Sequence, residues 1–480
     1  MVVRGLAVIV IVYVLFFHGM AATGLLGPDE PRYASIGREM ARSGDWVTPR
    51  LWGEPWFEKP ALLYWMTGAA FKLGLSDNLA PRLPVTLVSL AFLAFYWHAL
   101  SRRFGARAAW YSTAILGTSA AWLAFSYVAV TDLPMTAAFA AGMLMALDWV
   151  ETGDRRRLPL SAALLGIAVL GKGLVPLVLA APLAAMHWRR FPDWLRPFTV
   201  GAFLATAAPW YLLCWWRNGE PFVRTFFWEH QVGRFASEAL RHVQPFWFYA
   251  PVLAAGLLPW SPVLVLLFRR SLYRDRTRLF LLAWAAFGFL FFSASTNKLP
   301  GYLLPLLPAV TALMGIALAE SKRTASVLVA SMAMLVAIPV AAQVLPQALA
   351  GGLSRSTPPV FSWFWLTPLA GAAVVWRLRS TDNRVVAVTV STAAAVLFLK
   401  AAAFPAIDTA YSARPLWEEI SSRRDQVCIG EMHRSWRYGL NYYSVTPLPD
   451  CSDQPRPFEL RQDGADRGRP APPHLIESPQ

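Results

Sequence analysis

The sequence is dominated by apolar stretches of about twenty residues, separated by short segments that are rich in arginine. About twenty apolar residues in a helix cross the hydrocarbon core of a bilayer. Such a segment must be helical, because lipid offers no hydrogen bonds to its backbone. We predict thirteen spans, at 5–26, 79–100, 107–127, 131–150, 158–171, 174–187, 197–216, 246–267, 279–294, 303–319, 324–345, 360–376 and 385–402.

Composition supports a polytopic membrane protein. Hydrophobic residues make up 56% of the 480 residues and charged residues only 15%, whereas soluble chains carry ~25% charged residues. This balance excludes four classes of protein: a chain of several soluble domains, an intrinsically disordered chain, a coiled coil and a disulfide-rich scaffold. The net charge of +15 would indicate nucleic acid for a soluble chain, but in a membrane protein basic residues gather in short cytoplasmic loops.

The positions of the arginines predict the orientation. Six alternate loops carry clusters of basic residues, at 102–107, 155–157, 189–196, 269–278, 322–323 and 377–384. All six can be cytoplasmic only if 158–187 is a hairpin that crosses twice, rather than one helix broken at Gly171-Lys172-Gly173. The N-terminus is then inside and the C-terminus outside, and the first apolar stretch is an uncleaved helix that imitates a signal peptide.

The loops on the side opposite the basic loops differ from them in length and composition. The first outer loop, 27–78, and the second, 217–245, are long and carry mixed charges and aromatic residues. Residues 1–402 therefore form a transmembrane domain. Residues 403–453 form a small outer domain with a helix at 414–424, a strand at 426–430 and a helix or strand at 438–445. Residues 454–480 read as a disordered tail.

Asp29 and Glu30 follow the first span directly. The pattern after them predicts a helix on the membrane surface, and carboxylates at its start are favoured by the helix dipole. Both residues could be catalytic, or they could merely cap this helix. Asp132, at the outer end of a later span, has the same two interpretations, because a carboxylate at membrane level marks function but aspartate is also a good N-cap.

Lysine is rare in this chain, with six residues, and three of them fall on the outer face: Lys59, Lys172 and Lys298. The positive-inside rule disfavours that placement, so an anionic lipid headgroup would explain it. The alternatives are a snorkelling Lys59 in an aromatic belt and a solvated Lys172 in a turn. Tyr302 adds a hydroxyl donor close to Lys298.

The second outer loop brings Glu229, His230 and Arg234 together within two helical turns. With Glu58 of the first loop, Glu229 and His230 could hold a divalent metal. No motif spacing demands a metal, and no cofactor is certain.

Several of these segments resemble one family. Asp-Glu-Pro-Arg-Tyr-Ala at 29–34, Gly-Asp-Trp-Val-Thr-Pro at 44–49 and Phe-Glu-Lys-Pro at 57–60 resemble the first periplasmic loop of aminoarabinose-transferase-like glycosyltransferases, in the protein mannosyltransferase-like GT-C superfamily. Glu-His-x-x-x-Arg-Phe at 229–235, Lys-Leu-Pro-Gly-Tyr at 298–302 and Gly-Leu-Asn-Tyr-Tyr at 439–443 follow in the family's order. The C-terminal region is short for the family, which makes acceptor recognition the least transferable part.

The resemblance implies an all-α GT-C fold of about 13 transmembrane helices, with interfacial helices in the first periplasmic loop and a small C-terminal α/β domain. It implies a bacterial inner-membrane enzyme that moves a sugar from a polyprenyl-phosphate donor to lipid A or a similar envelope acceptor. Alternatives are a protein O-mannosyltransferase-like enzyme, a polyprenyl-linked glycan ligase and, further away, a lipid-sugar transporter. The sequence does not identify the sugar, the acceptor or the oligomeric state.

Roles can then be assigned to the candidate residues. The departing lipid phosphate develops negative charge, which the following residues would stabilise: Lys59, Arg234, Lys298 and Tyr302. Asp29 matches the family's loop-one aspartate and is the first candidate for the base, with Glu30, Glu58 and Asp132 as further acidic candidates and Lys172 as another site residue. Cys428 and Cys451 both fall in the outer domain, where an oxidising periplasm permits a disulfide.

Overall fold

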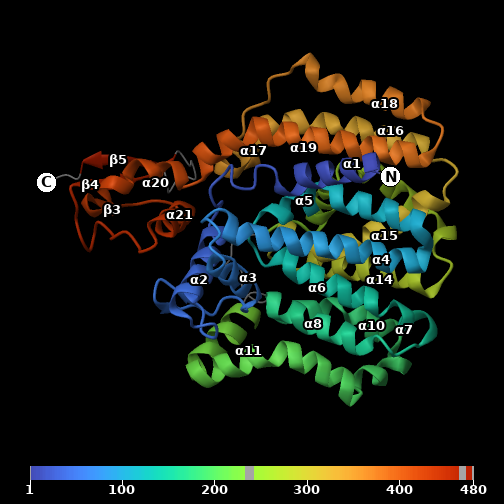
Figure 1. Ribbon diagram of the computed structural model, residues 1–480, viewed down its shortest axis with the longest axis horizontal. Coiled ribbons are helices and arrows are strands. Elements are labelled where there is room, and N and C mark those ends of the chain that lie inside the picture. Colours follow the sequence, from blue (N-terminus) through green and yellow to red (C-terminus); the bar gives the residue numbers. More distant parts are fainter. Residues whose placement is uncertain (1, 233–242, 464–471, 478–480) are drawn as a thin grey trace.

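The computed structural model describes residues 2–232, 243–463 and 472–477, and helices dominate them. In Figure 1 the helices lie roughly parallel in one bundle, and the C-terminal elements project from one end of it. Within these residues seven helical segments are long and apolar enough to cross a membrane. They are Leu79–Thr118 (α4), Asp132–Thr152 (α6, Asp132–Met145, and α7, Leu147–Thr152), Pro197–Glu229 (containing α11, Pro197–Val223), Arg276–Ala294 (α14), Pro300–Glu320 (containing α15, Leu307–Glu320), Ala325–Gly351 (α16, Ala325–Ala333, and α17, Ala337–Gly351) and Thr381–Tyr411 (α19).

Further apolar helices accompany these seven. Phe246–Gly256 and Ser261–Phe268 are bent by 115° relative to each other and pass the same test only as a pair. Three shorter apolar segments are Gly5–Phe17 (containing most of α1, Val2–Val12), Leu158–Lys172 (α8) and Val175–Met186 (α9, Val175–Leu179, and α10, Ala181–Met186). One more helix is α18, Thr367–Arg377.

Helix α4 is two antiparallel helices joined at Gly105. Gly105 has φ 83° and ψ 158°, a conformation that suits glycine because it has no Cβ. The Tyr96 hydroxyl donates to the carbonyl of Pro308 (2.7 Å), and the Ser112 hydroxyl contacts the carbonyl of Ala312 (3.4 Å). Sixteen residues of straight helix would separate Tyr96 from Ser112 by about 24 Å, but their partners are one turn apart on α15. The chain therefore reverses at Gly105.

The basic loops gather at one end of the bundle, as the sequence predicts. Arg103 pairs with Glu151 and donates to Thr277 (3.0 Å). The other links at this end are Arg107–Asp382 (3.2 Å), Arg155–Asp193 (3.3 Å), Arg278–Glu320 (2.6 Å) and Thr324–Thr381 (2.8 Å). Together these contacts connect all six loops. The Arg155–Asp193 pair also joins the two ends of 158–187, so this stretch is the predicted hairpin.

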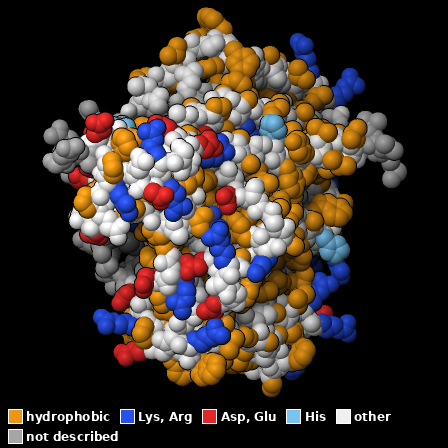
Figure 2. Space-filling view, turned by 60° about the vertical axis from the view of Figure 1, so that its left-hand side comes forward, with side chains coloured by type: hydrophobic (Ala, Val, Ile, Leu, Met, Phe, Trp, Pro, Cys, Tyr) orange, Lys and Arg blue, Asp and Glu red, His pale blue; other side chains and the backbone are white. Residues whose placement is uncertain are grey.

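The other end of the bundle carries the first outer loop. Two helices, α2 (Asp29–Ser43) and α3 (Leu62–Lys72), pack on each other, and a short antiparallel hairpin of β1 (Arg50–Leu51) and β2 (Glu54–Pro55) lies between them in sequence. Figure 1 places α2 and α3 between the bundle and the C-terminal elements. Basic and acidic side chains intermingle on this end of the molecule, whereas apolar side chains dominate the flank (Figure 2).

The C-terminal elements form their own core. Helices α20 (Arg414–Ile420) and α21 (Arg434–Ser444) pack with β3 (Val427–Ile429), β4 (Phe458–Arg461) and β5 (His474–Glu477). The sheet order is β3-β4-β5, with β3 and β4 parallel and β4 and β5 antiparallel. The predicted helix at 414–424 and strand at 426–430 are confirmed. The prediction of disorder for 454–480 is wrong where β4 and β5 form, because backbone pairing with β3 orders a segment whose composition is polar.

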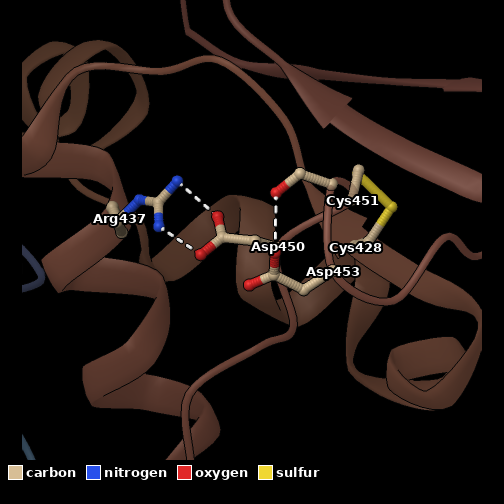
Figure 3. Close-up of a disulfide and its surroundings, with 6 residues drawn as sticks. Cys428, Arg437, Asp450, Cys451 and Asp453 are labelled. Atoms are coloured by element: carbon tan, nitrogen blue, oxygen red, sulfur yellow. Dashed lines mark hydrogen bonds and ion pairs between the residues drawn. A yellow bond between two sulfur atoms is a disulfide. The ribbon is translucent and has the colours of Figure 1, made fainter.

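The predicted disulfide is also present. Cys428 on β3 is bonded to Cys451 in the segment that follows α21. Beside it Arg437 of α21 pairs with Asp450 (2.6 Å), so a covalent bond and an ion pair hold the same segment against the domain (Figure 3).

Candidate active site at the outer end of the bundle

The two acidic residues that open α2 have different surroundings. Glu30 is fully buried, and its two oxygens accept from Nε and a terminal nitrogen of Arg82 at 2.7 and 2.8 Å. The backbone N–H groups of Leu26 (2.8 Å) and Ala129 (3.0 Å) also donate to this carboxylate. Glu30 was predicted as a catalytic candidate, but its carboxylate is saturated and closed to solvent. Glu30 therefore has the geometry of a structural anchor, because it holds together the three segments that carry Leu26, Arg82 and Ala129.

Asp29, one residue earlier, is open. Its side chain is 52% exposed and contacts Arg32 at 2.5 Å, one turn along α2. Arg32 in turn pairs with Glu58 (3.0 Å), and Glu58 pairs with Lys59 (3.1 Å). Four side chains of alternating charge thus form a chain that begins at the exposed Asp29 carboxylate and ends at the buried Lys59 ammonium.

Aromatic rings enclose the middle of this chain. The Arg32 guanidinium lies 5.1 Å from the centre of the Tyr33 ring, 5.4 Å from that of Trp56 and 5.7 Å from that of Tyr438. Tyr438 belongs to α21, so the C-terminal domain supplies one wall. Burial raises the pKa of Tyr33 well above its usual value, which keeps this phenol neutral. The charged groups are therefore held in a partly dry site, where electrostatic effects are strong.

A second cluster lies at the outer ends of the spans. Lys172, at the end of α8, contacts Asp132, at the start of α6, at 2.6 Å. The Lys172 ammonium also lies 4.9 Å from the centre of the Tyr302 ring. Gly301 packs closely against this cluster, because a Cβ at that position would be 2.6 Å from the Phe125 ring and 3.2 Å from the Asp132 carboxylate. The structure thus joins three of the predicted residues, from three separate segments, in one cluster.

Apolar packing brings the two clusters toward each other. Phe57 and Ala61, which flank Glu58 and Lys59, share one buried cluster with Leu170, two residues before Lys172. Lys298 is buried in the same outer region, and its ammonium donates to the carbonyls of Gln244 (2.9 Å) and Ser295. The site is therefore a concentration of cations and carboxylates at the outer ends of several helices.

The predicted metal group finds little support. Glu58 contacts Arg32 and Lys59, and Glu229, 52% exposed, lies 3.5 Å from Arg224. Within the part of the chain that the structure describes, no three His, Cys, Asp or Glu side chains gather in a group suited to a metal. Glu58 does not fit a metal ligand here, because cations already neutralise it. The side chain of His230 and all of Arg234 lie outside the described residues.

Sequence reasoning missed three residues of this region. Arg32 stands three positions after Asp29, a spacing that brings two side chains together on a helix, so it could have been found. Arg82 is an arginine inside an apolar stretch, which calls for a buried partner. Tyr438 gave no local signal, because only the docking of α21 brings it to Arg32.

The comparisons with known proteins find similarity to membrane transferases. The family model described as dolichyl-phosphate-mannose-protein mannosyltransferase matches residues 58–215. The undecaprenyl phosphate-alpha-4-amino-4-deoxy-L-arabinose arabinosyl transferase of Pseudomonas aeruginosa strain PAO1 is 33% identical over 62% of this chain and 57% of the relative. The relative of the same name from Erwinia tasmaniensis is 35% identical over 58% of this chain and 52% of the relative. The chain thus spans just over half the length of these curated relatives.

Similarity to a solved structure extends over nearly the whole chain. ArnT from Cupriavidus metallidurans bound to undecaprenyl phosphate is 25% identical, covers 96% of this chain and 93% of its own, and has a TM-score of 0.76. The same protein in the apo state gives a TM-score of 0.74. An Archaeoglobus fulgidus oligosaccharyltransferase, 12% identical with a TM-score of 0.52, shares the fold alone.

Proposed function

We propose that this chain is an aminoarabinose-transferase-like membrane enzyme with the fold of the GT-C superfamily, and that it transfers a sugar from a polyprenyl-phosphate donor to lipid A or a similar envelope acceptor. The observation that carries the proposal is the convergence at one end of the bundle. There the open Asp29 carboxylate, the buried Lys59 and the Asp132–Lys172–Tyr302 cluster lie on packed, neighbouring elements.

The proposed topology has thirteen spans. Counting α4 as two crossings, the bent pair as one, and the three shorter apolar segments and α18 as one each brings the seven long segments to thirteen. The end with six basic loops is cytoplasmic by the positive-inside rule. The N-terminus is then inside, and the active site and the C-terminal domain face the periplasm of a bacterial inner membrane. We propose domains at 1–402 and from 403 onward, with β4 and β5 included in the second.

The donor phosphate is proposed to bind the cations of the outer end. Cleavage of a glycosyl–phosphate bond leaves negative charge on the lipid phosphate, and preorganised cations and hydroxyl donors stabilise that charge without reorganisation. Lys59 and Lys298 are buried in this region, Tyr302 contacts Lys172, and Arg234 completes the proposed set. Lys172 is the fourth cation near the phosphate, with its charge balanced by Asp132.

Asp29 is the proposed base. A carboxylate must orient or deprotonate the acceptor hydroxyl while the sugar passes through an oxocarbenium-like state. Among the acidic candidates, Asp29 alone combines substantial exposure with a place in the ion chain, since Glu30 is saturated by Arg82 and Glu58 by two cations. Arg32 is proposed to hold the Asp29 carboxylate in one orientation.

The function is tested by mass spectrometry of lipid A from cells that lack the gene and from cells complemented with the wild-type or Asp29→Asn chain. We expect a sugar-sized mass on lipid A that only the wild-type chain restores, and this mass identifies the sugar. Glycoproteins from the same cells test the second acceptor class, which the mannosyltransferase family match favours. Unchanged lipid A, glycoproteins and envelope glycans would contradict the proposal and favour a transporter.

A further inference from the structure

An apolar groove between α4, α6 and α8 continues into a basic pocket at the opposite end of the bundle from the active site. The groove has a volume of about 410 Å³ and is lined by side chains such as Val88, Ala138 and Ile167. The pocket has a volume of about 300 Å³ and is lined by His98, Arg102, Arg103, Asp148 and Arg157, among others. Met145 and Leu160 line both hollows, so the apolar groove and the basic pocket adjoin each other.

The charges of the pocket leave one cation in excess. Arg103 pairs with Glu151, and Arg157 pairs with Asp148 at 2.9 Å. Arg102 also lines the pocket, is exposed, and forms no ion pair among the residues that the structure describes. His98 is a further donor. A single negative charge would therefore balance the pocket.

Backbone geometry adds to this preference. Helix α8 begins at the pocket, and no side chain caps its N-terminus. The Leu158 N–H donates to the carbonyl of Arg155 and Pro159 has no N–H, so the contribution to anion binding here comes from the helix dipole. The pocket also lies at the end where the basic loops meet, which is the end that faces the anionic leaflet surface in the proposed topology.

The dimensions of the groove fit one acyl chain. Along α6 its lining runs from Pro134 to Met145, a rise of about 16 Å at 1.5 Å per residue. This length is close to that of one acyl chain, which fills half of the ~30 Å hydrocarbon core. The other end of the groove, lined by Leu62 and Met66, lies toward the active site, so the tail of a polyprenyl donor is the competing occupant.

We propose that this cavity binds a phospholipid of the inner leaflet that carries one negative charge, with its phosphate at Arg102 and one acyl chain in the groove. Basic pockets between transmembrane helices on the cytoplasmic side are known sites for anionic headgroups. The site is separate from the donor site, and it does not depend on which sugar or acceptor the protein uses. It depends on the basic end facing the inner leaflet.

Native mass spectrometry of the full, delipidated chain titrated with phosphatidylglycerol or phosphatidylcholine tests the proposal. We expect the first phosphatidylglycerol to bind about fivefold more tightly than phosphatidylcholine, the effect of one cation at a membrane surface. Arg102→Gln should abolish this preference, whereas Arg156→Gln, in an exposed arginine that does not line the pocket, should keep it. Ala91→Trp, which fills the groove from its exposed side, should weaken both lipids.

Three results would overturn the proposal. The first is equal affinity of the wild-type chain for the two lipids. The second is an equal effect of Arg102→Gln and Arg156→Gln. The third comes from the same instrument with undecaprenyl phosphate: binding that Ala91→Trp abolishes and Arg102→Gln leaves intact would assign the groove to the donor's tail.

Discussion

The first turn of α2 carries two adjacent carboxylates, and the regions that surround them differ. Below it, between α2 and α4, Glu30 is fully buried, and Arg82 and two backbone N–H groups saturate it. Above it, between α2 and the C-terminal domain, Asp29 is half exposed and, among the residues that the structure describes, forms its ion pair with Arg32. Adjacent carboxylates on one helix thus face a packed interior and an open site.

The difference shows what distinguishes a structural carboxylate from a reactive one. Its burial and its number of hydrogen-bond partners are more informative than its proximity to a sequence motif. A buried charge with all of its hydrogen bonds satisfied stabilises one arrangement of the chain and has no capacity left for a substrate. A carboxylate with free acceptor positions and access to solvent can take a proton. Removing the buried Glu30 carboxylate should therefore impair folding, and removing the exposed Asp29 carboxylate should impair turnover.

The largest effect on stability is expected for Glu30→Gln. The variant leaves the Arg82 guanidinium buried without a countercharge, and breaking one partner of a buried pair costs ~3–5 kcal/mol. We expect little folded protein in detergent and a strongly lowered thermal midpoint, measured by fluorescence-detected size-exclusion after heating.

Glu39→Gln is the matched control for Glu30→Gln, because Glu39 lies on the same helix, is more accessible and accepts one hydrogen bond from Gly53. It should lose less than ~1 kcal/mol, as is usual for surface positions. If both variants had the wild-type thermal midpoint, Glu30 would not be the anchor described above.

The next effect concerns the upper region, where α21 covers Arg32. Cys428→Ser opens a loop with a sequence separation of 23 residues, which should destabilise the C-terminal domain by about 3 kcal/mol. Limited proteolysis of the oxidised protein should then cut between residues 412 and 463 while the bundle stays intact. Equal protease resistance of Cys428→Ser and wild type would show that the Arg437–Asp450 pair alone holds the segment.

Much of this comparison could be predicted from the sequence, because spans, loop charges and outer motifs depend on local composition. Apolar length predicts a bundle of apolar helices, and the arginines predict the end at which the basic loops meet, including the two ends of 158–187. Asp29 and Lys59 could be named as candidates for the same reason, since each lies in a short segment of distinctive composition.

What could not be predicted depends on contacts between distant segments. The burial of Glu30 could not be predicted, because it rests on its pairing with Arg82, some fifty positions away. The order of β4 comes from pairing with β3, and the place of Tyr438 comes from the docking of α21 on α2. Single-residue patterns carry no information on such pairings.

A smaller effect, on binding, is expected at the buried end of the ion chain. Lys59→Gln removes a charged donor from the proposed phosphate site, and such hydrogen bonds contribute ~1.5–3 kcal/mol, so KM for the polyprenyl donor should rise about tenfold or more. Lys72→Gln, in an exposed lysine on α3, is the control. An unchanged KM in Lys59→Gln would remove Lys59 from the donor site.

The smallest effect is expected for the wall that the C-terminal domain supplies. Tyr438→Ala removes one ring from Arg32, and a cation–π contact is worth ~0.5–2 kcal/mol. We expect kcat/KM to fall about fivefold, with Tyr438→Phe close to wild type because the ring is kept. Equal losses in Phe and Ala variants would point to the hydroxyl instead of the ring.

The central claim is that Asp29 acts as the base of the reaction, whereas its neighbour Glu30 stabilises the fold. The most direct test measures turnover and the thermal midpoint of purified Asp29→Asn beside Glu39→Gln. A general base contributes ~10²–10⁴-fold. We therefore expect kcat of Asp29→Asn to fall by that factor while its midpoint and donor KM stay within error of wild type and Glu39→Gln stays active. Near-normal kcat in a folded Asp29→Asn protein would contradict the account.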